Sequence, residues 1–550
     1  MKARISRATV FAAAVLMLAS LAACSGGASK KSGEGNGGTG SALPSGGAPG
    51  SAPGSAPGGG TPAAAGTLDV QAENAQPGTP AWKNGIDSGA DHGIEGFADQ
   101  VAVTSGQPFK LYVNTVALQF TATAFRIGYY HGAQGRQVWK SPPTAGRIQP
   151  AAAVKPQVNT VTAAWQPSLT VPTAGWPEGS YLIRLDPVDL QGKVAAKGAR
   201  FVPITVKSTT TAGKVVLING VTTWQAYNAY GGYDLYSGGP KNDYAHRARI
   251  VSFDRPYDSS GADRFQTYEQ SSIVLSEKVA AENHLQLAYA TDLDLHENPG
   301  LFQGARAIIT LGHDEYWSAQ MRDTVTKARD AGTNVAFLGA NAVFRHIRFQ
   351  DSPLGKDRVQ VDYKDAAEDP VHVTDPAQAT QDWRYPPQPR PENVLTGVLY
   401  ECNPANADFV VYDPGSWLLA GTGARAGQAF KGLVGVEYDR VVADSGTPHP
   451  IQAISHSPIT CRKTRSYADA AYYTVPSGAG VFATGTMRWN CALVDGGCTD
   501  KMDGPAHAFA QKVTANLLLA FAAGPAGKDH PAQDNTAGLK PAPSEGGQAP

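Results

Sequence analysis

A histidine and two carboxylates follow a short apolar run in the segment Leu311-Gly312-His313-Asp314-Glu315-Tyr316-Trp317. If the extended backbone of residues 307–310 continues, His313 and Glu315 point to one side and Asp314 points to the other. An imidazole and a carboxylate on the same side can bind one metal ion. A hydrogen bond between them that braces a strand–helix turn explains the same spacing, so the motif alone leaves both interpretations open.

Tyrosines recur in a second polar segment, which follows the apolar run 215–218. They are Tyr227, Tyr230, Tyr233 and Tyr236. A stripe of tyrosines is more typical of packing or of a sugar-binding surface than of a metal site. However, the carboxyl ends of parallel strands meet at one edge of a sheet, which would bring this segment close to His313.

Several motifs occur together in the order of a known family: Thr223-Trp224-Gln225-Ala226-Tyr227-Asn228, Ala290-Thr291-Asp292-Leu293-Asp294, Gly312-His313-Asp314-Glu315-Tyr316-Trp317, Gly339-Ala340-Asn341 and Ala483-Thr484-Gly485-Thr486-Met487-Arg488-Trp489. Over residues 214–523 the chain resembles the large (beta) subunit of N,N-dimethylformamidase and its catalytic-domain relatives. The β-rich segment before residue 214 is also similar to the one that precedes this domain in many exported relatives.

The resemblance implies a mononuclear Fe(III) site with tyrosine, histidine and glutamate ligands. Carried over to this chain, the ligands are Tyr227, His313 and Glu315, with Tyr230 or Tyr233 as alternatives for the tyrosine. Asn341 is the nearby polar residue, although it could simply cap a turn. Zinc is the alternative metal.

Such a site suits hydrolysis of an amide. A phenolate is a hard anionic ligand, and a metal must hold it deprotonated because the free phenol has a pKa of about 10. A bound metal ion polarises a carbonyl and acidifies water, while a general base takes up a proton. We assign this base to Glu437, for which an exposed glutamate at a strand edge is the alternative. Three further groups are weaker candidates for the site. Asp292, Asp294 and His296 could bind a cation or support the ligands, while His246, Arg247, Arg345 and Arg348 could line the pocket or its solvated rim. His456 and His507 are more typical of structural histidines.

The elements that would position these residues fall into two parts. Residues 68–207 contain alternating apolar and polar stretches separated by turn residues, which predicts an antiparallel β sandwich. Residues 214–523 begin with buried apolar runs alternating with helical stretches, which predicts an α/β domain. The resemblance implies a flavodoxin-like sheet, as in class I glutamine amidotransferases. No cysteine lies at a strand–turn–helix elbow, which excludes their thiol mechanism.

The two ends of the chain carry other signals. Residues 1–23 have a positive start and a short apolar stretch, as a signal peptide has. Leu21-Ala22-Ala23-Cys24 resembles the lipobox of bacterial lipoproteins, so we expect a lipid on Cys24 and a location at the outer face of the cytoplasmic membrane. A freely secreted protein is the alternative. Residues 24–67 and 524–550 have the composition of a flexible linker and a disordered tail.

Four other cysteines, Cys402, Cys461, Cys491 and Cys498, lack the spacing of a structural zinc site. In an exported protein they predict two disulfides, for which three pairings are open. We favour Cys491–Cys498 across a glycine turn and, by elimination, Cys402–Cys461.

The chain has 550 residues, 46 Lys and Arg, 47 Asp and Glu, and a net charge of -1, which argues against nucleic-acid binding through bulk positive charge. The resemblance implies an iron-dependent hydrolase of an amide or another linear C–N bond, with a small amide-like substrate, and the lipobox-like sequence implies that it is anchored to a membrane. A surface protein that binds glycans or other ligands without turnover is the competing hypothesis. Assembly into a homo-oligomer is left open.

Overall fold

The computed structural model describes residues 68–86, 93–189, 191–442, 446–495, 497 and 502–540. All of them belong to one compact unit of the chain, Pro62–Pro550. The expected signal peptide, Cys24, the linker and Cys498 lie outside the described residues. Within these residues, no helix combines the length and the apolar character that a bilayer span requires.

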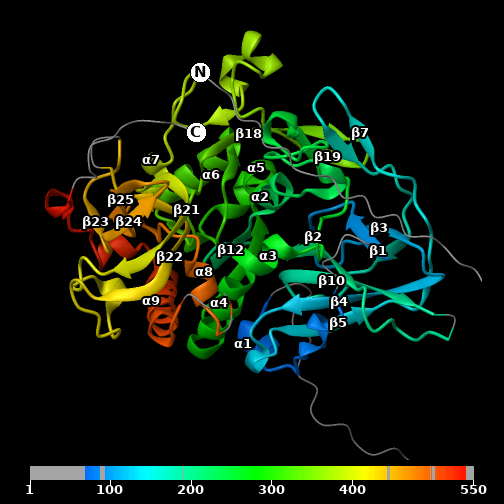
Figure 1. Ribbon diagram of the computed structural model, residues 1–550. Helices are drawn as coiled ribbons and strands as arrows, with labels where there is room; N and C mark the ends of the chain where they lie inside the picture. The colour runs from blue at the N-terminus through cyan, green and yellow to red at the C-terminus, as the bar shows by residue number, and fades with distance from the viewer. Residues whose placement is uncertain are drawn as a thin grey trace, which may run out of the picture. The chain divides into compact units, whose positions relative to one another are not determined.

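Two sheets form from the first part of the described chain. One contains β1 (Ile94–Ala98), β3 (Phe109–Thr115) and β9 (Leu169–Val171). The other runs in the order β2 (Ala102–Thr104), β11 (Arg200–Lys207), β10 (Gly179–Val188), β4 (Gln119–Ile127) and β5 (Gly135–Lys140) (Figure 1). Alternate residues of both sheets, such as Val113, Phe120 and Ile183, meet in one hydrophobic cluster.

The central sheet has seven strands in the order β14 (Leu287–Thr291), β12 (Val215–Asn219), β15 (Ala307–Thr310), β17 (Asn334–Phe337), β27 (Gly480–Ala483), β26 (Ala471–Thr474) and β23 (Ile451–Ala453). The first five are parallel, and the last two are antiparallel to their neighbours. The middle residues of the parallel strands are apolar and buried because both faces of the sheet are covered. Leu217 packs in the same cluster as residues of α4 (Gln270–Asn283) and α9 (Gly504–Ala523), whereas Val216 packs with residues of α5 (Asp292–Glu297) and α6 (Ala319–Asp330).

The predicted fold class, a flavodoxin-like or class I glutamine amidotransferase-like α/β fold behind a β sandwich, is wrong. The chain is rich in strands that form several sheets, and only 24% of it is helical. Alternation of strand and helix stops after β17, and the residues before β27 form mainly hairpins and short turns. The prediction failed because it extended the pattern of residues 215–337 to the rest of the domain.

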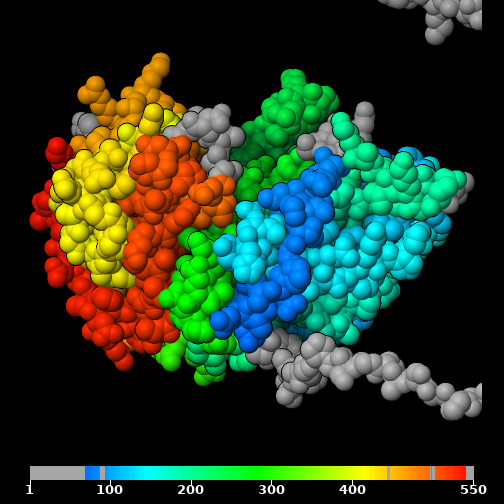
Figure 2. Space-filling view, turned by 90° about the horizontal axis from the view of Figure 1, so that it is seen from below, coloured from blue at the N-terminus to red at the C-terminus, as the bar shows by residue number. Residues whose placement is uncertain are grey.

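The hairpins after β17 form further sheets, one of which includes two strands from earlier in the chain. This sheet contains β13 (Ile250–Ser252), β19 (Gly355–Val361), β18 (Arg345–Ser352) and β16 (Tyr316–Ser318). The long strands β21 (Leu399–Val410) and β22 (Ala429–Arg440) pair with each other, as do β24 (Ser457–Cys461) and β25 (Thr464–Ala468). Strand β22 lies beside α9 (Figure 2). The rings of Phe430 and Phe509 stack there with their centres 3.8 Å apart.

The remaining α-helices and strands of the described residues are short, and short 3-10 helices lie between elements. The α-helices are α1 (Val70–Asn74), α2 (Val221–Ala226), α3 (Asp263–Tyr268), α7 (Asn393–Thr396) and α8 (Trp489–Ala492), and the strands are β6 (Thr144–Ala145), β7 (Ala153–Lys155), β8 (Thr160–Thr162) and β20 (Gln381–Asp382). The predicted disulfide Cys402–Cys461 is confirmed, and it links β21 to the end of β24.

Candidate active site

The candidate residues follow the carboxyl ends of three parallel strands. Tyr227 comes after β12 and α2, the His313–Glu315 segment follows β15, and Asn341 follows β17. The last two loops cross at Gly312 and Gly339, where a β-carbon on Gly339 would lie 2.2 Å from the Gly312 carbonyl oxygen. A β-carbon on Gly312 would lie 1.9 Å from the carbonyl oxygen of Tyr268. Only glycine permits this approach, which brings the two loops together.

Glu315 lies at the centre of the site. The hydroxyl of Tyr227 donates to its Oε2 at 2.7 Å, and the hydroxyl of Tyr236 donates to its Oε1 at 2.8 Å. The two hydroxyls are 3.1 Å apart, and His313 Nε2 lies 3.2 Å from Glu315 Oε2. The structure therefore brings the three predicted ligands together and adds a second phenol.

The other two tyrosines of the loop have different surroundings. The Tyr230 hydroxyl donates to Glu95 at 2.9 Å, and the Tyr233 ring packs against a small apolar cluster. The sequence placed Tyr236 in the tyrosine cluster but not among the alternative ligands. The loop folds back because the Leu235 amide donates to the carbonyl of Ala226, and this contact carries no motif in the sequence.

Burial and charge set the electrostatics of the site in the metal-free protein. Burial alone would raise the pKa of Glu315, but His313, Lys364 and Arg345 lower it to about 2. Burial alone would lower the pKa of His313, but Glu315 and Glu437 raise it. His313 Nε2 is buried, and no described group has the geometry of a hydrogen bond to it despite the short distance to Glu315.

These donors fit a hard metal ion. Among the described residues, no group of three or more His, Cys, Asp or Glu side chains could hold a metal. A metal at Glu315 would therefore need phenol oxygen as well as His313, and Tyr227 and Tyr236 offer it. Phenol and carboxylate oxygens with one imidazole nitrogen suit a trivalent ion such as Fe(III).

Two cations lie behind this cluster. Arg345 Nε donates to Glu315 Oε1 at 3.3 Å. Lys364 Nζ donates to the Tyr316 hydroxyl at 2.8 Å and lies 3.4 Å from the centre of the Tyr236 ring. Burial, with the charge of Arg345, lowers the pKa of Lys364 to about 7. The sequence singled out Arg345 but gave no signal for Lys364, which comes from β19 and the turn after it.

Glu437 reaches the same site from β22. Burial and the charge of Glu315 raise its pKa, while His313, Asn341 and Asn403 oppose this shift. Its side chain is 8% exposed, so it is not the surface glutamate of the alternative interpretation. Oε2 of Glu437 and Oδ1 of Asn341 are both buried without a hydrogen-bond partner among the described residues.

The weaker candidates have partners that explain them structurally. Asp294 caps the first turn of α5, and His296 contacts the Ser318 hydroxyl at 2.8 Å. The same holds for Asp292 with Thr222, His246 with Asp243, Arg247 with Tyr363, Arg348 with Asp369, His456 with Asp469, and His507 with Ala492. Of the weaker candidates, only Arg345 contacts Glu315.

Comparison with models of protein families identifies a family that this chain matches. The family model described as N,N-dimethylformamidase beta subunit-like, C-terminal, matches residues 121–502. The match begins within β4 and includes every candidate residue of the site. No curated protein matches the chain.

Proposed function

Since the chain belongs to the N,N-dimethylformamidase beta subunit-like family, we propose that it is an amidohydrolase that cleaves a C–N bond with the help of a bound iron ion. The observation that carries this proposal is the set of three buried polar atoms without hydrogen-bond partners among the described residues. They are His313 Nε2, Asn341 Oδ1 and Glu437 Oε2, and they come from three different segments. Buried polar atoms are rarely left without a partner, which indicates that a metal, water or substrate fills this place.

The iron would be held by Tyr227, His313 and Glu315, with Tyr236 as a fourth donor. When bound, such an ion polarises an amide carbonyl and acidifies water. Arg345 and Lys364 offset the negative charge of the phenol and carboxylate ligands from the protein side.

Glu437 and Asn341 would deprotonate and orient the attacking water. Oε2 of Glu437 accepts a proton as the water oxygen bonds to the amide carbon, and Asn341 Oδ1 accepts the second hydrogen and fixes the direction of attack. The proton held by Glu437 then passes to the amide nitrogen as the C–N bond breaks, and the products are a carboxylic acid and an amine. In the metal-free protein, burial and the charge of Glu315 raise the pKa of Glu437, so its carboxylate binds a proton more tightly than an exposed glutamate does.

Metal analysis and turnover of the purified protein test this proposal. We expect about one iron per chain and release of an amine from N,N-dimethylformamide or another simple amide. The variants His313→Ala and Glu315→Ala should lose the iron. Wild-type iron content in both variants would contradict the ligand assignment, and a metal-free wild type that binds glycans without turnover would favour the competing function.

We also propose that the protein is exported and held at the outer face of the cytoplasmic membrane by a lipid on Cys24. The support is the lipobox-like sequence. The variant Cys24→Ala should move from the membrane fraction to the medium, and unchanged membrane association would contradict the anchor.

A further inference from the structure

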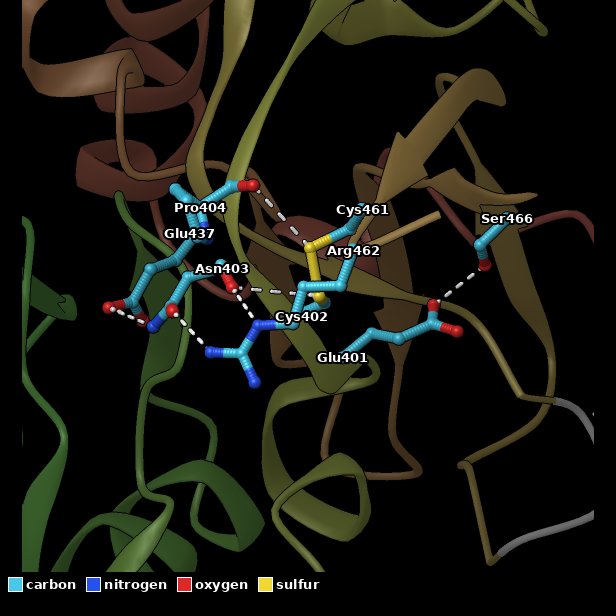
Figure 3. Close-up of a disulfide and its surroundings, with 8 residues drawn as sticks. All are labelled: Glu401, Cys402, Asn403, Pro404, Glu437, Cys461, Arg462 and Ser466. Atoms are coloured by element: carbon cyan, nitrogen blue, oxygen red, sulfur yellow. Dashed lines mark hydrogen bonds between the residues drawn. A yellow bond between two sulfur atoms is a disulfide. The ribbon is translucent and has the colours of Figure 1, made fainter. Parts of the chain in front are cut away.

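A break in the β21–β22 ladder places Asn403 against the candidate base. Cys402 pairs with Tyr438, and Ala405 pairs with Val436. Two residues separate Cys402 from Ala405 in β21, but only one residue separates Tyr438 from Val436 in β22. The extra residue forms a bulge, which re-aims side chains out of the regular ladder. From this bulge Asn403 Nδ2 donates to Glu437 Oε1 at 3.3 Å (Figure 3).

Arg462 fixes the orientation of this amide. Its Nη2 donates to Asn403 Oδ1 at 3.3 Å, and its Nε donates to the Asn403 carbonyl oxygen at 2.8 Å. A guanidinium only donates hydrogen bonds, so the amide oxygen must face Arg462 and the NH2 group must face Glu437. Asn403 is thereby held as a donor to the carboxylate.

The disulfide joins the two segments that carry this contact. Cys402 precedes Asn403 and Cys461 precedes Arg462, and the disulfide holds their α-carbons 6.3 Å apart (Figure 3). The bulge of β21 and the turn between β24 and β25 therefore cannot separate while the bond is intact.

The two oxygens of Glu437 are left with different surroundings. Oε1 accepts from Asn403, whereas Oε2 is buried with no hydrogen-bond partner among the described residues. A general base needs this asymmetry, because one oxygen must be held in place and the other must be free to take a proton.

We propose that Asn403 is a positioning residue that holds Glu437 for proton transfer, and that Arg462 and the Cys402–Cys461 disulfide hold Asn403 in turn. This inference rests on the proposed function, in which Glu437 is the base. Asn403 does not touch the substrate; it acts through Glu437.

Kinetics of the iron-loaded protein with N,N-dimethylformamide as the probe test the inference. In Asn403→Ala and Arg462→Gln we expect kcat to fall roughly tenfold while KM and iron content stay at the wild-type values, because misplacing a catalytic group slows the chemical step alone. The double variant Cys402→Ser with Cys461→Ser should change kcat in the same direction. The matched control is Arg465→Gln, an exposed arginine on the same hairpin, which should leave kcat unchanged.

Crystal structures of the wild type and of Arg462→Gln provide a readout that does not depend on turnover. We expect Glu437 Oε1 within hydrogen-bond distance of Asn403 in the wild type and a displaced carboxylate in the variant. The inference is overturned if Glu437 keeps its place in the variant, or if both single variants retain kcat within twofold. If the wild type cleaves no amide but Glu437 moves in the variant, the positioning role stands and the proposed function fails.

Discussion

At the scale of single residues, the site depends on how little freedom Glu315 has. It is fully buried, its two oxygens accept from two different tyrosines, and its pKa of about 2 keeps it ionised. The sequence identified His313 and Glu315 because their close spacing in one segment is a local property. The choice among the four tyrosines is not local, since it depends on how the loop that carries them folds back.

The visible absorption of the iron-loaded protein can show which tyrosines bind the iron. In the iron-loaded protein, Tyr227→Phe and Tyr236→Phe should each weaken or abolish the visible phenolate-to-iron band, because both hydroxyls lie at the Glu315 carboxylate. Tyr230→Phe is the control, since its hydroxyl bonds to Glu95 instead. Absorbance spectra at equal iron content make the comparison, and a band of unchanged position and intensity in both variants would exclude phenolate ligation by either tyrosine.

An isosteric substitution can show whether Glu437 acts as the base or as a metal ligand. In Glu437→Gln we expect kcat to fall by about 10²- to 10⁴-fold, the usual contribution of a general base. Iron content should stay the same because Glu437 lies outside the ligand set. Amine release and metal analysis of the same sample check this, and a variant that loses both activity and iron would instead place Glu437 among the ligands.

At the scale of elements, the first strands of the central sheet could be predicted well because they are short and mostly apolar. The predicted apolar runs at 215–218 and 307–310 lie in β12 and β15. The fold class could not be predicted, because the residues from β18 to β25 carry few periodic signals and their pairing is decided by contacts distant in sequence. The bulge at Asn403 is of this kind in its pairing, although Pro404 beside it cannot donate to a ladder and so marks an interruption in the sequence.

One ion pair between elements is expected to matter for stability. Arg126 on β4 and Glu277 on α4 form a fully buried pair, which Tyr130 and Tyr289 extend with further hydrogen bonds. Replacing one partner, as in Glu277→Gln, leaves the other charge buried and should lower the free energy of unfolding by about 3–5 kcal/mol. Urea unfolding measures the change.

The control for this pair is Asp330→Asn. The side chain of Asp330 is 55% exposed and pairs with Arg329, and exposed pairs contribute about 0–1 kcal/mol. Equal effects of the two variants would mean that the Arg126–Glu277 pair is not a link between β4 and α4.

At the scale of the whole molecule, the N-terminal sheets and the central sheet share one interior. Phe125, Leu182 and Phe201 pack in the same cluster as Leu217 of β12 and residues of α4. The Asn219 side chain at the end of β12 accepts from Ser180 and Thr205 of the N-terminal sheets. We therefore expect these two parts of the chain to lose their structure together.

This stability should depend on pH through His346. Burial, with the nearby Arg348 and Arg390, lowers its pKa from 6.5 to about 4. The native state thus binds fewer protons than the unfolded state between about pH 4 and 6.5, so this contribution is complete above pH 6.5 and is lost as the pH falls to 4. A tenfold change in the proton affinity of the imidazole on folding corresponds to about 1.4 kcal/mol.

The variant His346→Gln should remove this part of the slope. The difference in unfolding free energy between wild type and variant should therefore change with pH between 4 and 6.5 and stay constant above. His284→Asn is the control, because His284 is exposed and ends α4 in a left-handed conformation that asparagine tolerates. If the unfolding free energies of the wild type and of His346→Gln change with pH in parallel, His346 is not the source of this pH dependence.

The crossing of the loops at Gly312 and Gly339 limits how this protein can evolve. A β-carbon at either position would overlap a backbone carbonyl, which no side-chain adjustment can relieve. In a randomised library selected for any new substrate, clones should diversify at side chains around Glu315 but keep glycine at both positions. The two glycines would then mark the part of the framework that every descendant enzyme inherits, whatever reaction it comes to catalyse.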